Sequence, residues 1–317
     1  RFALMVRAFN QGKISILLND FVFFEKKISQ PKFDKIYNEE IINYINLNDG
    51  IKHTTINNMS MFYSENSSNN KCIQFFNRGK MLIMGGFYDG KLMIFPIENK
   101  KGSEELYPFN EEKPILSVEI DKEENYLFLG NSVGNIWIYQ IEIDIKQWKR
   151  IHFKTDQISP ISHIYCNNEM NLWTSATIDG YINLYSLPLC KLIRCIKVNT
   201  KKCSYSFISS SPLPSIIVID DDENNSQIHA YTINGNFLFK QQEYVHMVNP
   251  VLIRDIYSFE YLAFIGKDNI IITKLPYLDT QVNIDCLPGV HSFCITEDNK
   301  ALFTIDKNGK KIVLIKD

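Results

Sequence analysis

MLIMGGFYDGKLMIFPI, the stretch from Met81 to Ile97, contains two apolar runs separated by the dipeptide Asp89-Gly90. An Asp-Gly pair between two apolar runs is the strongest short-range signal for a β-hairpin, because a type I′ turn requires positive φ angles that few other pairs tolerate. The stretch therefore predicts two antiparallel strands joined by a tight turn.

The same pattern returns five more times along the chain. The copies span residues 126–141, 172–187, 215–233, 261–275 and 301–315. Their turns, with that of the first copy, fall near residues 90, 134, 180, 226, 268 and 309, at intervals of 41 to 46 residues. This period is typical of a four-stranded propeller blade.

Further apolar runs supply the remaining strands of each period. One precedes several of the hairpins, as in Ile115 to Ile120, Pro160 to Tyr165 and Val251 to Ile256. Another follows, as in Lys191 to Val198 and Phe237 to Gln242. A four-stranded blade buries both of its faces only when blades pack in a ring. The sequence therefore predicts an all-β chain that folds as a β-propeller.

The N-terminal segment is expected to complete the ring. Six repeats are readable in residues 57–317, whereas residues 1–56 hold a degenerate first blade and an insertion. Lys13 to Asn19 and Phe21 to Ile28 resemble outer strands, and Gln30 to Met59 has partly helical spacing. We therefore predict a single domain, residues 1–317, of seven four-stranded blades, in which the last blade takes its outer strand from the N-terminal part.

Charge and cysteine content exclude several classes of protein. The chain has 34 Lys and Arg against 36 Asp and Glu, so its net charge of −2 gives no reason to expect nucleic acid, nor membrane attachment by charge alone. Seven cysteines without a CxxC pair are typical of free thiols in a reducing compartment, which favours the cytoplasm. Because the chain begins with Arg1 and not Met, we expect the natural polypeptide to extend upstream.

Patterns that could carry chemistry have simpler explanations. Gly130 to Gly134 matches the G-x-S-x-G nucleophile motif, but it falls where the repeat places a hairpin, whereas that chemistry needs a strand-to-helix turn. His163 and Cys166 are three residues apart, which puts them on opposite faces of a strand. Asp220 to Asn224 lacks the glycine and the distal glutamate of a calcium loop. We predict no catalytic residue, no metal and no cofactor.

Turn residues are the candidate contacts with a partner. Tyr88 precedes the Asp89-Gly90 turn and Tyr181 follows the Asp179-Gly180 turn. In a propeller these turns open on the same rim, and exposed aromatic side chains frequently anchor interfaces. We predict partner contacts at Tyr88, Asp89, Asp179 and Tyr181. The two aspartates can instead fix their own turns through hydrogen bonds from side chain to backbone.

Three segments resemble the propeller that follows the BEACH domain in neurobeachin-like and large-vacuole-sphere-type proteins. They are Met84 to Phe95 (MGGFYDGKLMIF), Ala176 to Ile196 (ATIDGYINLYSLPLCKLIRCI) and Ser209 to Phe237, which contains SSSPLPSIIVI and YTINGNF. Their order also matches. The repeats lack the WD dipeptide and the Gly-His pair, so they are degenerate WD repeats. The resemblance covers about Cys72 to Asp317.

The resemblance implies the C-terminal propeller of a larger protein, with pleckstrin-like and BEACH domains upstream. It implies a non-catalytic scaffold of vesicle traffic, lysosomes and autophagy, whose rim loops bind protein partners, the upstream BEACH domain among them. It also implies a cytoplasmic location, peripheral on endosomal or lysosomal membranes. Two alternatives stay open: a phosphoinositide-binding peripheral membrane adaptor, and a propeller enzyme with carboxylates or metal ligands converging in the channel.

Overall fold

The computed structural model describes residues 6–8, 14–16, 72–77, 80–86, 89–96, 104–106, 113–142, 145–154, 159–187, 189–200, 202–221, 225–244, 247–254, 258–266, 269–278, 281–285, 290–295, 301–306 and 312–316. Within them, no helix is both long and apolar enough to cross a membrane. The described helix η4 (Ile145–Gln147) is a single 3-10 turn, and nearly all other regular structure is β.

The strands follow one another with short connections. They are β1 (Val6–Ala8), β2 (Ile14–Ile16), β3 (Ile73–Phe76), β4 (Met81–Met84), β5 (Leu92–Pro96), β6 (Glu104–Leu106), β7 (Ile115–Ile120), β8 (Tyr126–Asn131), β9 (Ile136–Gln140), β10 (Lys149–Lys154), β11 (Ile161–Asn167), β12 (Leu172–Thr177), β13 (Tyr181–Ser186), β14 (Leu192–Lys197), β15 (Cys203–Ser209), β16 (Ser215–Asp221), β17 (Ser226–Thr232), β18 (Phe237–Tyr244), β19 (Val248–Arg254), β20 (Glu260–Ile265), β21 (Asn269–Lys274), β22 (Gln281–Asp285), β23 (Val290–Ile295), β24 (Ala301–Asp306) and β25 (Ile312–Lys316).

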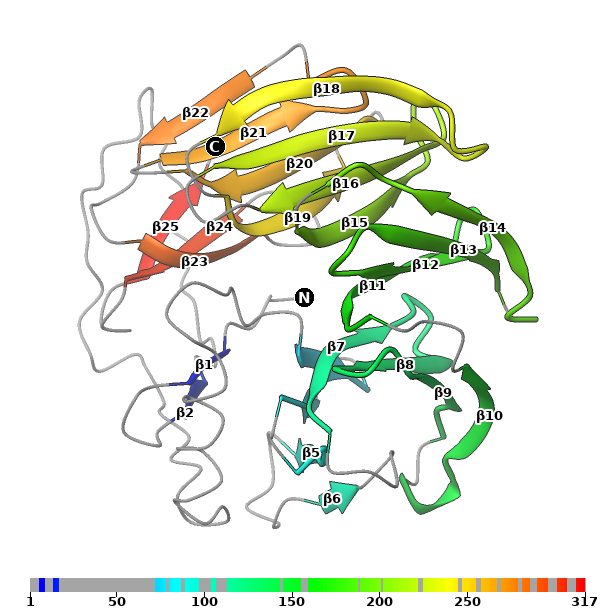
Figure 1. Ribbon diagram of the computed structural model, residues 1–317. Helices are drawn as coiled ribbons and strands as arrows, with labels where there is room; N and C mark the ends of the chain where they lie inside the picture. The colour runs from blue at the N-terminus through cyan, green and yellow to red at the C-terminus, as the bar shows by residue number, and fades with distance from the viewer. Residues whose placement is uncertain are drawn as a thin grey trace.

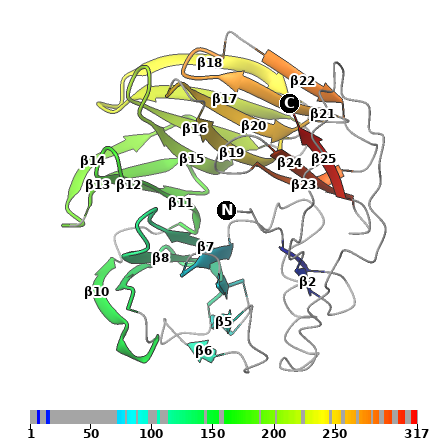
Figure 2. The ribbon, with the colours of Figure 1, turned by 180° about the vertical axis from the view of Figure 1, so that it is seen from behind.

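Each sheet is an antiparallel meander in sequence order, which is the architecture of a propeller blade. The five four-stranded sheets are β3–β6, β7–β10, β11–β14, β15–β18 and β19–β22, and β23–β25 forms a three-stranded sheet. The first strands of successive sheets contact one another around the centre. The fourth strands β10, β14, β18 and β22 lie at the periphery (Figures 1 and 2). The predicted β-propeller is therefore confirmed.

The predicted number of blades is wrong. The described residues form five complete four-stranded blades, a three-stranded sheet and the two-stranded pair of β1 and β2, not seven four-stranded blades. Ile14–Ile16, inside the predicted outer strand, pairs with Val6–Ala8 and not with β25. Local pairing closes a short loop at low entropic cost, whereas pairing with the last blade would close almost the whole chain. Phe21 to Ile28 and Gln30 to Met59 lie outside the described residues.

The predicted hairpins form, but the turns at Gly90, Gly134 and Gly180 are not of type I′. Gly134 and Gly180 have φ angles of 90° and 88°, while the residues just before them are not at positive φ. Gly180 N donates to Thr177 O at 2.9 Å, and Gly134 N donates to Asn131 O at 3.4 Å. In each case the hydrogen bond closes a four-residue β-turn whose last residue is a glycine with positive φ. This arrangement is typical of a three-residue hairpin loop with a G1 bulge. Gly90 is also left-handed, with φ of 71°, and Asp89 is not.

The apolar core lies between the blades. In β8, Leu127 and Leu129 belong to a buried cluster with the preceding blade, whereas Phe128 between them packs with the following blade. Alternate side chains of a strand point to opposite faces, so each strand contributes to two interfaces. The apolar runs of inner strands such as β8 and β11 are continuous for this reason, because both faces of these strands are largely buried.

Hydrogen bonds also join the innermost strands. Ile164 N donates to Ser117 Oγ at 2.9 Å, and Cys166 N donates to Glu119 Oε1 at 3.2 Å. One blade further, Asn167 Nδ2 donates to Ile208 O at 3.0 Å. Side chains of one blade thus satisfy backbone groups on the inner edge of its neighbour, and this keeps neighbouring blades in a fixed register.

Gly130 in β8 is expected to tolerate substitution poorly. A Cβ placed there would lie 2.4 Å from Ile161 Cγ2 and 2.8 Å from Ile161 Cβ, in the next blade. Gly130→Ala should therefore lower the free energy of unfolding by about 1–3 kcal/mol through overpacking. Gly85→Ala is the matched control, because its closest contact is 3.1 Å, to Ile115 Cγ2. Urea unfolding of both variants checks this, and equal losses would contradict it.

Candidate functional site

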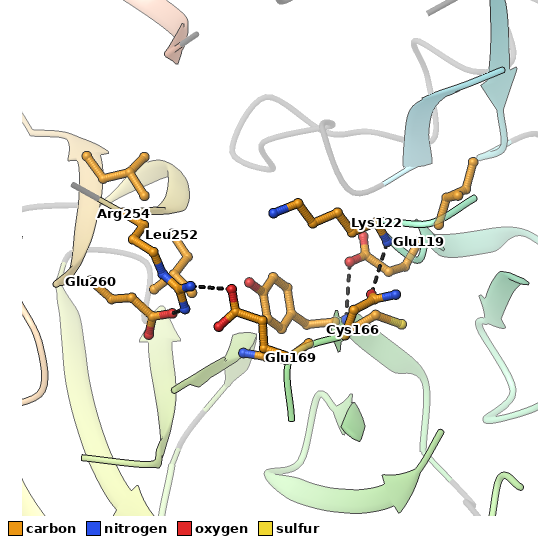
Figure 3. Close-up of a pocket in the computed structure, with 12 residues that line it drawn as sticks. Glu119, Lys122, Cys166, Glu169, Leu252, Arg254 and Glu260 are labelled. Atoms are coloured by element: carbon orange, nitrogen blue, oxygen red, sulfur yellow. Dashed lines mark hydrogen bonds and ion pairs between the residues drawn. The ribbon is translucent and has the colours of Figure 1, made fainter. Parts of the chain in front are cut away.

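The candidate site is a pocket of about 310 Å³ at the end of the ring where the innermost strands finish. Its walls come from the ends of β7, β11 and β19, the loops that follow β7 and β11, and the start of β20 (Figure 3). Innermost strands of successive blades run in the same direction, so residues about one repeat apart meet here. Glu119 and Cys166, for example, are 47 positions apart and share a hydrogen bond.

One side of the pocket is a network of ion pairs centred on Arg254. Its guanidinium contacts the carboxylates of Glu169 and Glu260, the latter at 2.6 Å (Figure 3). Glu260 is only 2% exposed, and its carboxylate also accepts hydrogen bonds from Ser209 Oγ at 2.6 Å and Ser210 N at 2.7 Å. The hydrogen bond to Glu169 raises the pKa of Arg254, and Arg254 lowers that of Glu169. The network ties three blades together at the pocket.

The other side of the pocket holds a carboxyl group with neutral partners. Glu119 accepts hydrogen bonds from Cys166 N and from Gln74 Nε2, both at 3.2 Å. Burial, opposed by the hydrogen bond from Cys166 and assisted by the charge of Asp121, raises the pKa of Glu119 to about 8. Tyr165 experiences the charges of both Glu119 and Glu260, and burial is the largest cause of its raised pKa. The pocket therefore has one carboxyl group that is costly to ionise.

This carboxyl group should make the stability of the protein depend on pH. The folded state holds the Glu119 proton more tightly than the unfolded state, so the free energy of unfolding falls as pH rises from about 5 to about 8. The glutamine of Glu119→Gln is neutral at every pH. In this variant the free energy of unfolding should therefore decrease less between these two pH values, by on the order of 1–3 kcal/mol. Urea unfolding at both ends of this pH range measures the difference. Parallel pH profiles for the two proteins would contradict the assignment.

The turn residues predicted to contact a partner lie at the opposite end of the ring. Hairpins between second and third strands and loops after first strands point in opposite directions, because neighbouring strands are antiparallel. Asp89 Oδ1 accepts a hydrogen bond from Lys91 N at 3.4 Å, and Asp89 also pairs with Lys91 Nζ at 3.5 Å. Tyr88 lies outside the described residues. Partner contacts at these positions stay a prediction.

Asp179 and Tyr181 are brought together around one turn. Asp179 Oδ1 accepts from Thr177 Oγ1 at 2.6 Å, and Thr177 Oγ1 in turn accepts from Tyr181 N at 3.0 Å. The Tyr181 ring is 42% exposed, and Lys197 Nζ lies 3.8 Å from its centroid. Asp179 thus orients its turn through the Thr177 hydroxyl and not through a direct bond to the backbone.

The motifs that resembled chemical sites have structural roles. Gly130 to Gly134 spans the end of β8 and the hairpin to β9, so a strand and not a helix follows Ser132. His163 packs against the rings of both Tyr205 and Phe207, with centroids 5.0 and 5.2 Å away. Among the described residues, no group of three or more His, Cys, Asp or Glu side chains could hold a metal. Five cysteines form no disulfide bond: Cys72, Cys166, Cys190, Cys195 and Cys203.

The pocket residues were not singled out by sequence analysis, although a signal existed. Glu119 interrupts the apolar run ILSVEI of β7, and Arg254 interrupts VLIRDI at the end of β19. A charged residue in an otherwise apolar strand rarely becomes buried without a partner. Both of these interruptions lie at the ends of innermost strands, where the pocket is formed.

Comparisons with known proteins support the fold alone. No protein-family model matches the chain, and no curated protein matches it. Hydrazine synthase of Kuenenia stuttgartiensis is structurally similar, with a TM-score of 0.60 and 10% sequence identity over 80% of this chain and 78% of that one. At this identity a common fold does not carry a common function. The chain is an all-β protein with a β-propeller fold.

Proposed function

We propose that this chain is a non-catalytic protein-interaction module that binds its partner at the pocket lined by Glu119, Tyr165 and Arg254. The observation that carries the proposal is the pocket of about 310 Å³, which is lined by both apolar and charged side chains. A few convergent polar groups beside apolar walls are typical of a binding site.

Rigidity of the frame supports this proposal. Apolar clusters join neighbouring blades, and the Arg254 network connects the loop after β11, the end of β15 and the start of β20. A site held by three blades requires little ordering when a partner binds, so less of the interaction energy is lost.

The resemblance to propellers of BEACH-domain proteins supplies the biological setting. Its three segments fall in the β4–β5 hairpin, in β12–β14 and in β15–β18. On this basis the module would be a degenerate WD-repeat scaffold of vesicle, lysosomal and autophagic traffic. It would act in the cytoplasm, peripheral on endosomal or lysosomal membranes, with the upstream BEACH domain among its partners. This setting rests on the resemblance of the sequence.

Variants at the two ends of the ring test the module and its location. Proteins captured by the tagged chain are identified, purified and measured for binary affinity against wild type, Leu252→Arg and Tyr181→Ala. Leu252 lines the pocket and also packs against the apolar cluster of β15–β21, whereas Tyr181 lies at the opposite end, so thermal melts must first establish that both variants are folded. We expect Leu252→Arg to weaken binding at least about tenfold, a loss of roughly 1.4 kcal/mol, and Tyr181→Ala to leave it unchanged.

The other outcomes are equally informative. Loss of binding in Tyr181→Ala alone would place the interface at the predicted turns and overturn the pocket assignment. If no purified protein binds and vesicles containing phosphoinositides do, with affinity that falls as salt rises, the membrane-adaptor alternative replaces this proposal.

A further inference from the structure

We propose that the pocket receives one cationic side chain of a partner polypeptide, an ammonium or a guanidinium group, with the Glu119 carboxylate as its counter-ion. This inference rests on the proposed function, since it names the chemistry that the same pocket recognises. It is carried by the distribution of charge and of hydrogen bonds among the lining residues.

When Glu119 is ionised, the lining has one more acidic than basic group, and the excess is at Glu119. Glu169, Glu260 and Glu119 face two cations, Arg254 and Lys122. Arg254 is bound to Glu169 and Glu260, and Lys122 is an exposed residue whose charge acts on Glu169. The hydrogen bonds described for Glu119 come only from the neutral donors Cys166 N and Gln74 Nε2. A ligand that adds one positive charge beside Glu119 would balance the pocket.

An anionic ligand fits the same surroundings poorly. When Glu119 is ionised, an anion would meet its carboxylate and also the charge of the buried Asp121, which acts on Glu119. The oxygens of Asp121 already accept from Tyr126 N and Asn168 Nδ2. Like charges at short range in a partly desolvated site repel more strongly than in water. A cation with N–H donors can instead occupy the acceptor positions of Glu119 that its two hydrogen bonds leave open, since a carboxylate has about four.

The remaining walls suit the stem of a long basic side chain. Leu252, Ile120 and Tyr165 are among the residues that line the pocket with Glu119 and Arg254. Lysine and arginine bury their methylene groups along such surfaces while the charged end reaches a counter-ion. The volume of about 310 Å³ admits one side chain of this length, so the ligand is an anchor residue of a larger partner and not a folded element.

Binding of a cation at Glu119 is linked to release of its proton. Because burial raises the pKa of Glu119 to about 8, the empty pocket holds the carboxyl largely protonated at neutral pH. The titratable groups around it are Tyr165 and Cys166 on β11, whose pKa values are raised, and Asp121 and Lys122 after β7. Gln74, from β3, does not titrate. Affinity for a cation should therefore rise with pH and level off near pH 8.

Defined peptides test the inference directly. The probes are acetyl-Gly-Gly-X-Gly-Gly-amide peptides with X as Lys, Arg, norleucine, citrulline or Glu, titrated into the isotope-labelled chain while amide shifts of the pocket are followed by NMR. We expect the Lys and Arg peptides to bind about tenfold more tightly than their uncharged counterparts at pH 8, and this preference to shrink towards pH 6.

Two isosteric variants separate a specific counter-ion from general electrostatics. Glu119→Gln should abolish both the preference and its pH dependence, while Glu169→Gln, which removes the same charge from a half-exposed side chain, should retain most of the preference. Thermal melts confirm that both variants are folded. Equal binding of the Lys and norleucine peptides, equal effects of the two variants, or tighter binding of the Glu peptide would overturn the inference. The pull-down with Leu252→Arg would be unaffected by that result, so failure of the inference and failure of the proposed function are distinguishable.

Discussion

Trp173→Ala is expected to lower the free energy of unfolding by about 3–5 kcal/mol, the range typical of emptying a buried aromatic site. Trp173 is fully buried in β12, and its ring stacks on Tyr185 of β13 with centroids 4.0 Å apart. It also meets Phe128 of the preceding blade at 5.0 Å. The cavity would therefore open at an interface between blades, where two sheets would have to move together to fill it. Urea unfolding at fixed pH measures the loss.

Trp173→Phe is the matched control for this prediction. The indole N–H of Trp173 is buried without a hydrogen-bond partner among the described residues, so phenylalanine removes an unsatisfied donor while it keeps most of the ring contacts. We expect the loss in this variant to stay below about 1.5 kcal/mol. If Trp173→Phe were as unstable as Trp173→Ala, ring packing would not be the source of the stability.

Arg254→Met should cost about 3 kcal/mol, because it leaves the carboxylate of Glu260 buried without its counter-ion. Glu260 is 2% exposed and would retain neutral donors from Ser209, Ser210 and Ser211. Glu169→Gln breaks the other ion pair of the same guanidinium, but the Glu169 side chain is 51% exposed. That variant should lose less than about 1 kcal/mol. Chemical unfolding of both variants gives the comparison.

The double variant Arg254→Met with Glu260→Gln completes the test. Once both charges are gone, no uncompensated ion remains in the interior, so part of the stability should return. A double variant that is less stable than Arg254→Met by the full cost of Glu260→Gln alone would show that the two residues act independently. The ion pair would then not be what holds the three blades together at the pocket.

The strands and hairpins were predictable because their signals are local. The prediction of Ile115 to Ile120 matches β7, and the glycines at 134 and 180 mark hairpins in the structure as in the sequence. Glycine tolerates positive φ wherever it stands, so the place of a turn is encoded by the residue itself. The kind of turn was mispredicted, since the hydrogen bond between Gly180 N and Thr177 O depends on how the flanking strands pair.

The number of complete blades and the candidate site depended on contacts between distant repeats. Ile14–Ile16 pairs with Val6–Ala8 and not with the last blade. The alternation of apolar residues shows that a segment can form a strand, but it does not show which strand will be its partner. The pocket joins Glu119, Glu169, Arg254 and Glu260, which come from three different sheets. Their sequence positions show only that charges interrupt apolar strands.

The sequence by itself determined a repeated unit of four short strands, because alternation of side chains and turn chemistry act over a few residues. Only the tertiary structure decided which charges became partners. Inner strands that run side by side place Cys166 N against Glu119, the loop after β11 brings Glu169 to Arg254 of another blade, and burial raises the pKa of Glu119. Desolvation and ion pairing depend on everything that surrounds a group in space, so they become defined only when the blades pack into a ring.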